Sequence, residues 1–284
     1  MKKRMQEIKF DQLGSWLTSW GSKSRDGDRV NFIVDSSSGK IPVGFVKRDN
    51  CEKLLVTYNG AVERSRSADG IVFQRSTWIA EFEASVLQFP DPTLLKDSGM
   101  SLGWGQLSQD QDAPPIWCEI LNVFRKTFNL PAAEKTLHFG TSAGGFQAIS
   151  TATLDRGSSV LVNNPQLDWY RYTSTVAVNR VLRNILKDPA GKKFLLSHPE
   201  RVRVWELFNK EKYFPKMVLY TNTASPGDYY DQLQPFLRAL PALGFLDTQW
   251  RLHTVFYRDS NAKHSPMPKG PTVKAIKEAL DQLQ

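Results

Sequence analysis

The sequence has little cysteine and no long hydrophobic run. It contains two cysteines, Cys51 and Cys118, in 284 residues, and neither lies in a CxxC pair or at a metal-ligand spacing from a histidine. A disulfide framework and a cysteine-based metal centre are therefore not expected, and we predict two free, buried thiols, no metal and no cofactor. No apolar stretch approaches membrane-spanning length, so we expect no membrane span.

Charge of one sign is not clustered along the chain. The formal net charge is +8, but lysine and arginine are scattered and no nucleic-acid-binding motif accompanies them. We interpret the charge as a solvated basic surface and expect no nucleic-acid partner, while an anionic substrate stays open. The basic residues 2–4 are not followed by the apolar core of a signal peptide, which predicts a cytoplasmic protein.

Repeats and low-complexity linkers are also absent, and the hydrophobic pattern predicts a single α/β domain over residues 1–284. The clearest expected helices are 115–128, 228–240 and 272–283. The eight expected strands are 29–34, 41–47, 53–58, 83–89, 135–139, 159–163, 216–221 and 250–257. The first two form a hairpin, and helices alternate with strands from the third strand onward. This alternation predicts a mostly parallel, doubly wound eight-stranded sheet flanked by helices.

A long connection separates the sixth and seventh expected strands. Residues 165–215 are mostly of helical character and exceed the usual length of such a connection. We therefore expect them to form a helical cap insertion over the active-site edge of the sheet.

The most informative motif is Gly140-Thr141-Ser142-Ala143-Gly144, which lies between an apolar strand and a helix-compatible segment. G-x-S-x-G in this context is typical of a nucleophile elbow, whose tight turn needs neighbours without bulky side chains. The alternative is a phosphate-binding loop, but the G-x-G-x-x-G pattern and the Gly-Lys-Ser/Thr ending are both missing. We therefore predict that Ser142 is a nucleophile.

With this motif and the order of its strands, the chain resembles the α/β-hydrolase superfamily, in particular its serine esterases. The likeness covers nearly the whole sequence. The runs 139–146 and 163–168 are also loosely similar to uncharacterised hydrolase-like proteins associated with bacterial polysaccharide biosynthesis. The first resemblance implies the α/β-hydrolase fold with a Ser, acid, His order along the chain, and the second suggests a carbohydrate context.

The resemblance implies a histidine after the last strand. His264 fits because it lies in a polar loop between the eighth strand and the last helix. His138 and His253 are expected inside strands and His198 in the cap. His264 is therefore the predicted general base.

The acid should follow the seventh strand, which makes Asp228 the preferred candidate. Asp228 follows Pro-Gly at the start of a helix, so an N-cap is the competing interpretation. Asp168, after the sixth strand, is the runner-up, and Asp231 and Asp259 are weaker alternatives.

An oxyanion hole requires two preorganised N–H donors. We expect one from the backbone of Ala143, beside the nucleophile, and the other from the loop after the third strand. There Gly60 permits close approach of the backbone, and Ala61 is the predicted donor. The His-Gly-Gly-Gly motif of lipases is missing, and a simple turn without a ligand is the alternative.

Further aromatic and polar residues follow the carboxyl ends of the strands, where ligands bind in open α/β sheets. Aromatic faces suit sugar rings, and guanidinium groups suit phosphate or carboxylate. Packing within the cap and ordinary surface charge explain the same residues. The candidates for substrate binding are Asn59, Arg64, Trp104, Trp169 and Tyr229, with Arg66, Arg171, Tyr172, Tyr230 and Lys263 nearby in the pattern.

Taken together, these residues predict a serine esterase, acyl hydrolase or O-acyltransferase that uses Ser142, His264 and Asp228. The expected substrate is a small-molecule or glycan ester that is carbohydrate-linked or anionic. The alternative is a non-catalytic α/β-hydrolase-like partner or assembly factor of glycan-synthesising enzymes, because a fold does not fix a function. The sequence leaves the acyl acceptor and the oligomeric state open.

Overall fold

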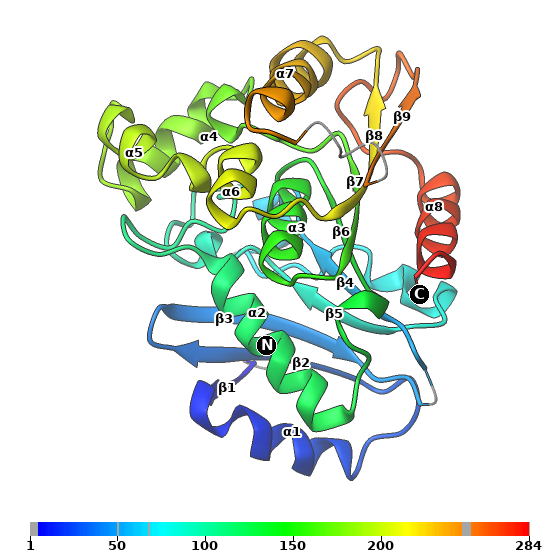
Figure 1. The fold of residues 1–284 in the computed structure, drawn as a ribbon. Helices are drawn as coiled ribbons and strands as arrows, with labels where there is room; N and C mark the ends of the chain where they lie inside the picture. Colours follow the sequence, from blue (N-terminus) through cyan, green and yellow to red (C-terminus); the bar gives the residue numbers. More distant parts are fainter. Residues whose placement is uncertain (1–4, 50, 68, 246–250, 284) are drawn as a thin grey trace.

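The computed structural model describes residues 5–49, 51–67, 69–245 and 251–283. They form one sheet with helices on both faces (Figure 1). Its strands are β1 (Gln6–Lys9), β2 (Arg29–Ser36), β3 (Gly39–Val46), β4 (Leu54–Tyr58), β5 (Ser85–Phe89), β6 (Thr136–Thr141), β7 (Ser159–Asn163), β8 (Lys216–Asn222) and β9 (Leu252–Tyr257). Their order across the sheet is β1-β2-β3-β5-β4-β6-β7-β8-β9.

The predicted mixture of strand directions is confirmed. β2 and β3 form an antiparallel hairpin and β3 is antiparallel to β5, whereas β5, β4, β6, β7, β8 and β9 run parallel to one another. The carboxyl ends of the parallel strands therefore meet at one edge of the sheet. Loops that follow β4, β6, β7, β8 and β9 are brought together there, which is where an open α/β sheet binds its ligands.

The expectation of eight strands is wrong by one strand at the N-terminal edge. β1 pairs in parallel with β2, with Gln6 opposite Phe32. Only Ile8 of its four residues is buried, so β1 lacks the alternation that reveals a strand in sequence. At the opposite edge β9 covers most of the expected strand 250–257, whose first residue, Trp250, lies outside the described residues.

Helices cover the two faces of the sheet unequally. The larger core includes buried residues of α1 (Leu13–Gly21), α2 (Ala113–Phe128), α3 (Ala143–Leu154) and α7 (Gln234–Ala242). The smaller core lies on the other face, between the sheet and α8 (Lys269–Asp281) with η3 (Ser76–Glu81). In α2 the buried side chains include Ile116, Ile120 and Phe124, the one-turn spacing that gives a helix a single apolar stripe.

Residues 165–215 are largely helical, with α4 (Thr175–Arg180), α5 (Lys192–Ser197) and α6 (Val204–Glu211) as their α-helices. α6 packs against α3 and α7, so the end of this segment belongs to the helical layer. α4 and α5 lie farther from the sheet (Figure 1). Within the described part of the chain, no helix has the length and apolar character to cross a bilayer.

Candidate active site

Ser142 lies at a sharp turn between β6 and α3, as the motif predicts. Its φ of 54° and ψ of −123° are unusual for a residue with a side chain. Backbone crowding explains the flanking glycines. A Cβ on Gly140 would lie 2.0 Å from the carbonyl oxygen of Gly144, and one on Gly144 would lie 2.8 Å from the backbone of Asn59. The elbow therefore closes only with glycine at both positions.

The structure brings Ser142, His264 and Asp228 together in one hydrogen-bonded chain. Ser142 Oγ lies 2.9 Å from His264 Nε2, and His264 Nδ1 lies 2.7 Å from Asp228 Oδ1. Asp228 is 5% exposed and Ser142 9% exposed, whereas the His264 side chain is 35% exposed. A buried carboxylate at Nδ1 fixes the imidazole tautomer that leaves Nε2 free to accept the serine proton.

Two buried asparagines at the ends of β7 and β8 hold the loop that carries His264. Asn222 Nδ2 donates to the carbonyl oxygens of Asp259 and Lys263 at 2.7 and 2.8 Å. Asn164 Nδ2 donates to the carbonyl oxygen of His264 at 3.3 Å, and Asn164 Oδ1 accepts from the Asn222 N–H. The roles of these two asparagines were not predicted from the sequence. The signal that could have identified them is a polar residue at the end of an apolar strand.

Gln166 is a second residue that sequence reasoning missed. Its side chain is fully buried, and Gln166 Nε2 donates to Ser142 Oγ at 3.1 Å. The indole N–H of Trp104 donates to Gln166 Oε1. Because an indole nitrogen is only a donor, this contact fixes the orientation of the amide and directs its NH₂ group at the serine.

The three alternative acids lie away from the histidine that contacts Ser142. Asp168 is fully buried, caps η6 (Trp169–Arg171) through the Tyr170 N–H, and pairs with Arg203 Nε at 3.1 Å. Burial raises the pKa of its carboxyl group. Asp259 accepts the N–H groups of its own loop, at Asn261 and Ala262, and Asp231 is exposed. None of the three is hydrogen-bonded to a histidine within the described residues.

The other three histidines lie where they were expected. His138 is a fully buried residue of β6, between Tyr58 and Asp155, and burial lowers the pKa of its imidazole. His253 is exposed on β9, and His198 lies in residues 165–215, 3.8 Å from Glu200. These placements leave His264 as the histidine that contacts Ser142.

The loop after β4 lies beside the elbow, as predicted for an oxyanion hole. The Gly60 N–H is engaged by Gln74 Oε1 at 3.0 Å, so Gly60 is not a free donor. Gln74 Nε2 also donates to the Ala61 carbonyl oxygen, which orients the peptide that follows. Ala143 begins α3, so its N–H has no carbonyl one turn earlier and remains available.

A cavity of about 470 Å³ opens at Ser142 and His264. The loop after β4 and the start of η3 form one side, and Tyr172 and the His264 loop form the other. Tyr172, from residues 165–215, lies with its ring centroid 5.7 Å from that of His264. The lining residues are Gly60, Ala61, Gln74, Arg75, Trp78, Thr141, Ser142, Tyr172, His264, Ser265, Pro266, Met267 and Lys269.

The five main candidates for substrate binding do not line this cavity, which corrects the sequence interpretation, whereas Tyr172 from the same pattern does. Trp104 and Trp169 are fully buried and stack on each other at 5.0 Å, so both are support for the site. Asn59 is buried and donates to the Val72 carbonyl oxygen. The Arg64 side chain donates to the carbonyl oxygens of Ser98 and Leu94. Tyr229 packs against Tyr230 and Phe256.

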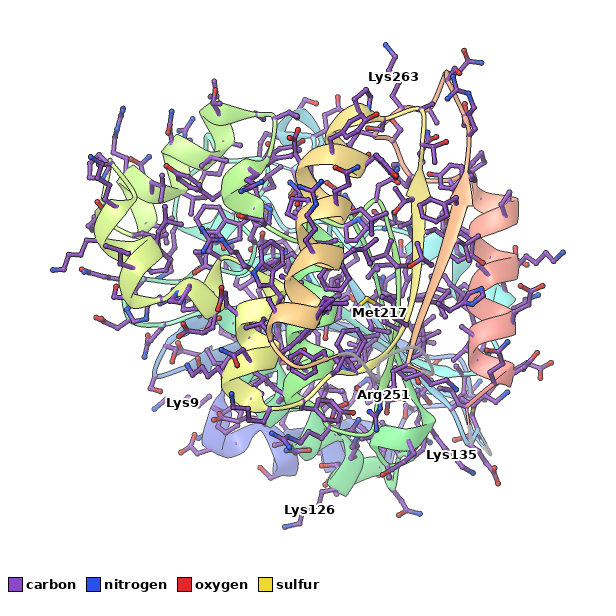
Figure 2. All side chains as sticks on the ribbon, turned by 45° about the horizontal axis from the view of Figure 1, so that its top comes forward. Lys9, Lys126, Lys135, Met217, Arg251 and Lys263 are labelled. Atoms are coloured by element: carbon purple, nitrogen blue, oxygen red, sulfur yellow. The ribbon has the colours of Figure 1, made fainter. Side chains whose placement is uncertain are left out.

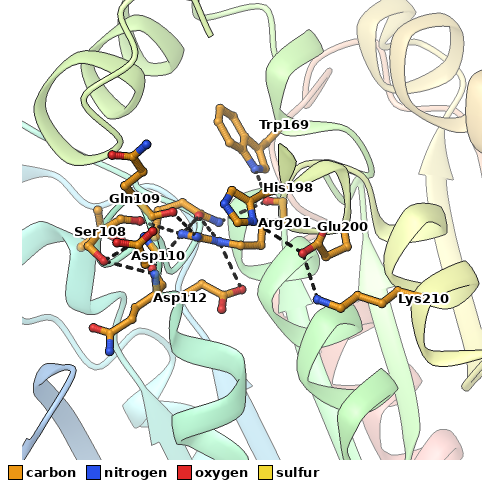
Figure 3. A network of polar contacts seen from close by, with 12 residues as sticks. Ser108, Gln109, Asp110, Asp112, Trp169, His198, Glu200, Arg201 and Lys210 are labelled. Carbon is orange, nitrogen blue, oxygen red and sulfur yellow. Dashed lines mark hydrogen bonds and ion pairs between the residues drawn. The ribbon is translucent and has the colours of Figure 1, made fainter. Parts of the chain in front are cut away.

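Arg201 contacts Trp169 and is the centre of a network of polar contacts (Figure 3). Its guanidinium group donates to Gln106 Oε1 and to the carbonyl oxygens of Ser108, Gln109 and Gln111, all at 2.7–2.8 Å. Its own carbonyl oxygen accepts from the Trp169 indole N–H at 2.7 Å. Arg201 thereby joins the loop at 106–112 to residues 165–215. A continuous set of contacts runs from this junction through the tryptophans to Gln166 and Ser142.

The two thiols are free but only partly buried. Burial raises the pKa of the Cys118 thiol, so it is protonated at neutral pH. In the described ranges, no three His, Cys, Asp or Glu side chains gather as metal ligands would.

No protein-family model matches the sequence, and no curated protein matches it. Solved structures are similar in three dimensions. The capsule O-acetyltransferase of Neisseria meningitidis serogroup A has a TM-score of 0.59 at 11% identity, over 85% of this chain and 95% of that one. An S-formylglutathione hydrolase from Agrobacterium tumefaciens has a TM-score of 0.60 at 12% identity, over 92% and 98%.

Porphyromonas gingivalis dipeptidyl peptidase 4 has a TM-score of 0.62 at 12% identity and matches 94% of this chain. The chain spans 37% of the length of that peptidase. At these identities the likeness concerns the architecture alone, and that architecture is the α/β-hydrolase fold.

Proposed function

We propose that this protein is a serine esterase or O-acyltransferase in which Ser142, His264 and Asp228 form a catalytic triad. The observation that carries the proposal is the hydrogen-bonded chain at the elbow, with 2.9 Å from Ser142 Oγ to His264 Nε2 and 2.7 Å from His264 Nδ1 to Asp228 Oδ1. These are the contacts by which a histidine activates a serine hydroxyl and a carboxylate orients the histidine.

In the proposed reaction, Ser142 Oγ bonds to the carbonyl carbon of an ester while its proton moves to His264 Nε2. The negative charge on the carbonyl oxygen is stabilised by the backbone N–H groups of Ala143 and Ala61. The ester C–O bond then breaks, and His264 gives the proton to the departing alcohol oxygen. An acyl-serine remains, and an incoming hydroxyl group releases the acyl group by the same steps in reverse.

The incoming hydroxyl belongs to water in an esterase and to an acceptor alcohol in a transferase. The Neisseria structure named above is described as a capsule O-acetyltransferase. This likeness, and the loose resemblance of residues 139–146 and 163–168 to polysaccharide-associated proteins, support a glycan hydroxyl as the acceptor. The substrate we propose is thus a small-molecule or glycan ester.

The proposal is tested by following acetyl release from p-nitrophenyl acetate, with and without an added sugar acceptor. We expect Ser142→Ala and His264→Gln to lower kcat/KM by at least about 10³-fold, because each removes a group that acts in the transition state. His253→Gln is the matched control, since His253 is exposed on β9, and it should retain activity. Unchanged hydrolysis in Ser142→Ala would refute the proposal, and acetylated sugar in the product would identify a transferase.

A further inference from the structure

The cavity contains an arginine that sequence reasoning did not single out. Arg75 directly precedes η3 and adopts a left-handed backbone with φ of 60°. Arg75 Nη2 donates to Thr141 Oγ1 at 2.9 Å. Thr141 is the neighbour of Ser142 in the chain, so this bond holds the guanidinium group beside the reaction centre.

Aromatic rings fix the position of this guanidinium group further. Its carbon lies 5.4 Å from the centroid of the Trp78 ring and 5.3 Å from that of Phe139. Phe139 belongs to β6 and is fully buried, while Trp78 lines the cavity. Contacts of this kind orient an arginine through its flat faces and leave the N–H groups at its edge for an acceptor.

Arg75 has no carboxylate partner in the part of the chain that the structure describes. Two other partly buried arginines have one: Arg125 pairs with Asp155 at 2.6 Å and Arg203 with Asp168 at 3.1 Å. Among the described residues, the one hydrogen bond from the Arg75 side chain goes to the neutral Thr141 hydroxyl. Burial lowers the pKa of the Arg75 guanidinium to about 10, so it is still charged at neutral pH.

The cavity lining offers no counter-charge either. It includes no aspartate or glutamate among the described residues, and its other cation, Lys269, is paired with Glu81 at 2.8 Å. A partly desolvated charge without a partner is unfavourable, and an anionic ligand group would remove that penalty. The cavity therefore carries an uncompensated positive charge next to Ser142.

We propose that Arg75 binds an anionic group, a carboxylate or a phosphate, of the substrate whose ester bond Ser142 attacks. This inference rests on the proposed function and adds the substrate class to it. The planar guanidinium group can donate two parallel hydrogen bonds to either kind of oxyanion. Arg75 thus replaces Arg64, whose side chain is occupied by backbone carbonyl oxygens, as the residue that selects for charge.

Binding can be measured separately from catalysis in the Ser142→Ala protein by isothermal titration calorimetry. Two ester pairs serve as probes: monoethyl succinate against diethyl succinate for a carboxylate, and 2-acetoxyethyl phosphate against 2-acetoxyethanol for a phosphate. We expect at least one anionic ester to bind about tenfold or more tightly than its neutral counterpart, which is typical of hydrogen bonds between charged groups. The ester pair with the larger ratio of anionic to neutral affinity shows whether the site prefers a carboxylate or a phosphate.

Introducing Arg75→Gln into the same protein should abolish this preference, whereas Arg75→Lys should keep part of it. Arg183→Gln removes the same unit of charge from an exposed residue and should leave the ratio unchanged. Because Arg75 is shielded in the cavity, the preference should also persist at about 0.5 M salt, where surface steering is screened.

Equal affinity for charged and neutral esters, no binding of any probe, or a preference that survives Arg75→Gln would overturn the inference. A loss of thermal stability in Arg75→Gln without loss of the ratio would assign Arg75 a structural role alone. All of these outcomes are measured as binding affinity or thermal stability, so they do not depend on catalytic turnover. Failure of the esterase assay with an intact anion preference would refute the proposed reaction and leave the anion site standing.

Discussion

Two neighbours of Ser142 Oγ determine where its proton points. Gln166 Nε2 can only donate to this oxygen, at 3.1 Å, so the hydroxyl proton is directed at His264 Nε2 on the other side, at 2.9 Å. Gln166 is in turn oriented by the indole of Trp104. We interpret Gln166 as a positioning residue, because it acts on the reaction through the serine.

This role makes Gln166→Glu informative. A carboxylate cannot donate to Ser142 Oγ, so we expect kcat to fall about 10- to 100-fold with little change in KM, somewhat less than the loss of an oxyanion donor. Trp104→Phe keeps the stacking on Trp169 but frees the amide, and should cause a smaller loss. For both variants, the effect is measured by steady-state kinetics and by the affinity for a boronic acid transition-state analogue. A rise in KM alone would show that Gln166 binds substrate instead.

The two buried aspartates near the site should differ sharply. Asp228→Asn should lower kcat by about 10⁴-fold, because an amide stabilises the wrong imidazole tautomer. Asp168→Asn should change kcat by less than about tenfold, since Asp168 caps η6 and pairs with Arg203. Kinetics of the two purified variants on one ester give the ranking, and the reverse ranking would move the acid to the loop after β7.

The residues of the hydrogen-bonded chain could be predicted because chain order and motif spacing are properties of the sequence. Ser142, His264 and Asp228 each follow a recognisable strand. Gln166 and Arg75 could not be found in this way. Their roles depend on how two loops, far apart in the sequence, turn their side chains toward the elbow. The signal that was available for Gln166, its place in the run 163–168, indicated a family likeness and not a contact.

At the scale of elements, the strands of the parallel half were predicted well because each is a compact apolar run between turn signals. β1 was missed because its four residues bury one side chain. Its stability comes from pairing with β2 and not from its own pattern. The helical character of residues 165–215 was also predictable, but the packing of α6 against α3 was not, since an amphipathic helix does not reveal its partner.

We propose that the earlier part of residues 165–215 caps the cavity and contacts substrate through Tyr172. Tyr172→Ala should raise KM for bulky esters about 3- to 10-fold more than for acetate esters, because it removes one wall of the cavity. Leu196→Ala is the control in the same segment, since Leu196 is 84% exposed. The effect is measured as KM for a series of p-nitrophenyl esters of increasing length. An equal change in KM for all esters would contradict the proposal that this segment caps the cavity.

At the scale of the whole molecule, lysines project at well-separated places on the surface. Figure 2 shows Lys9, Lys126, Lys135 and Lys263 projecting from separate edges of the protein. Such a surface favours weak attraction of anions from all sides, which salt screens. In our proposal the charge that selects the substrate is that of Arg75 in the cavity, and the overall charge of +8 does not locate it.

Acid should destabilise the folded protein through its core. Burial lowers the pKa of His138 from the usual 6.5, so below that pH the unfolded chain binds a proton that the folded protein does not. The free energy of unfolding should then decrease as the pH falls from about 7.5 to about 5.5. Urea titrations at both pH values measure this change. It should shrink in His138→Gln and persist in the control His253→Gln, and an equal decrease in all three proteins would rule out His138.

The central claim is that Ser142 is an activated nucleophile, and reaction with a fluorophosphonate probe tests it most directly. Mass spectrometry of the labelled protein should find one phosphonylated peptide, modified at Ser142. Labelling should be abolished in Ser142→Ala and slowed by at least about 10³-fold in His264→Gln, because the probe reacts only with a serine whose proton is removed by the histidine. A folded protein that remains unlabelled, or that is labelled equally in Ser142→Ala, would contradict the claim and favour a non-catalytic partner of glycan-synthesising enzymes.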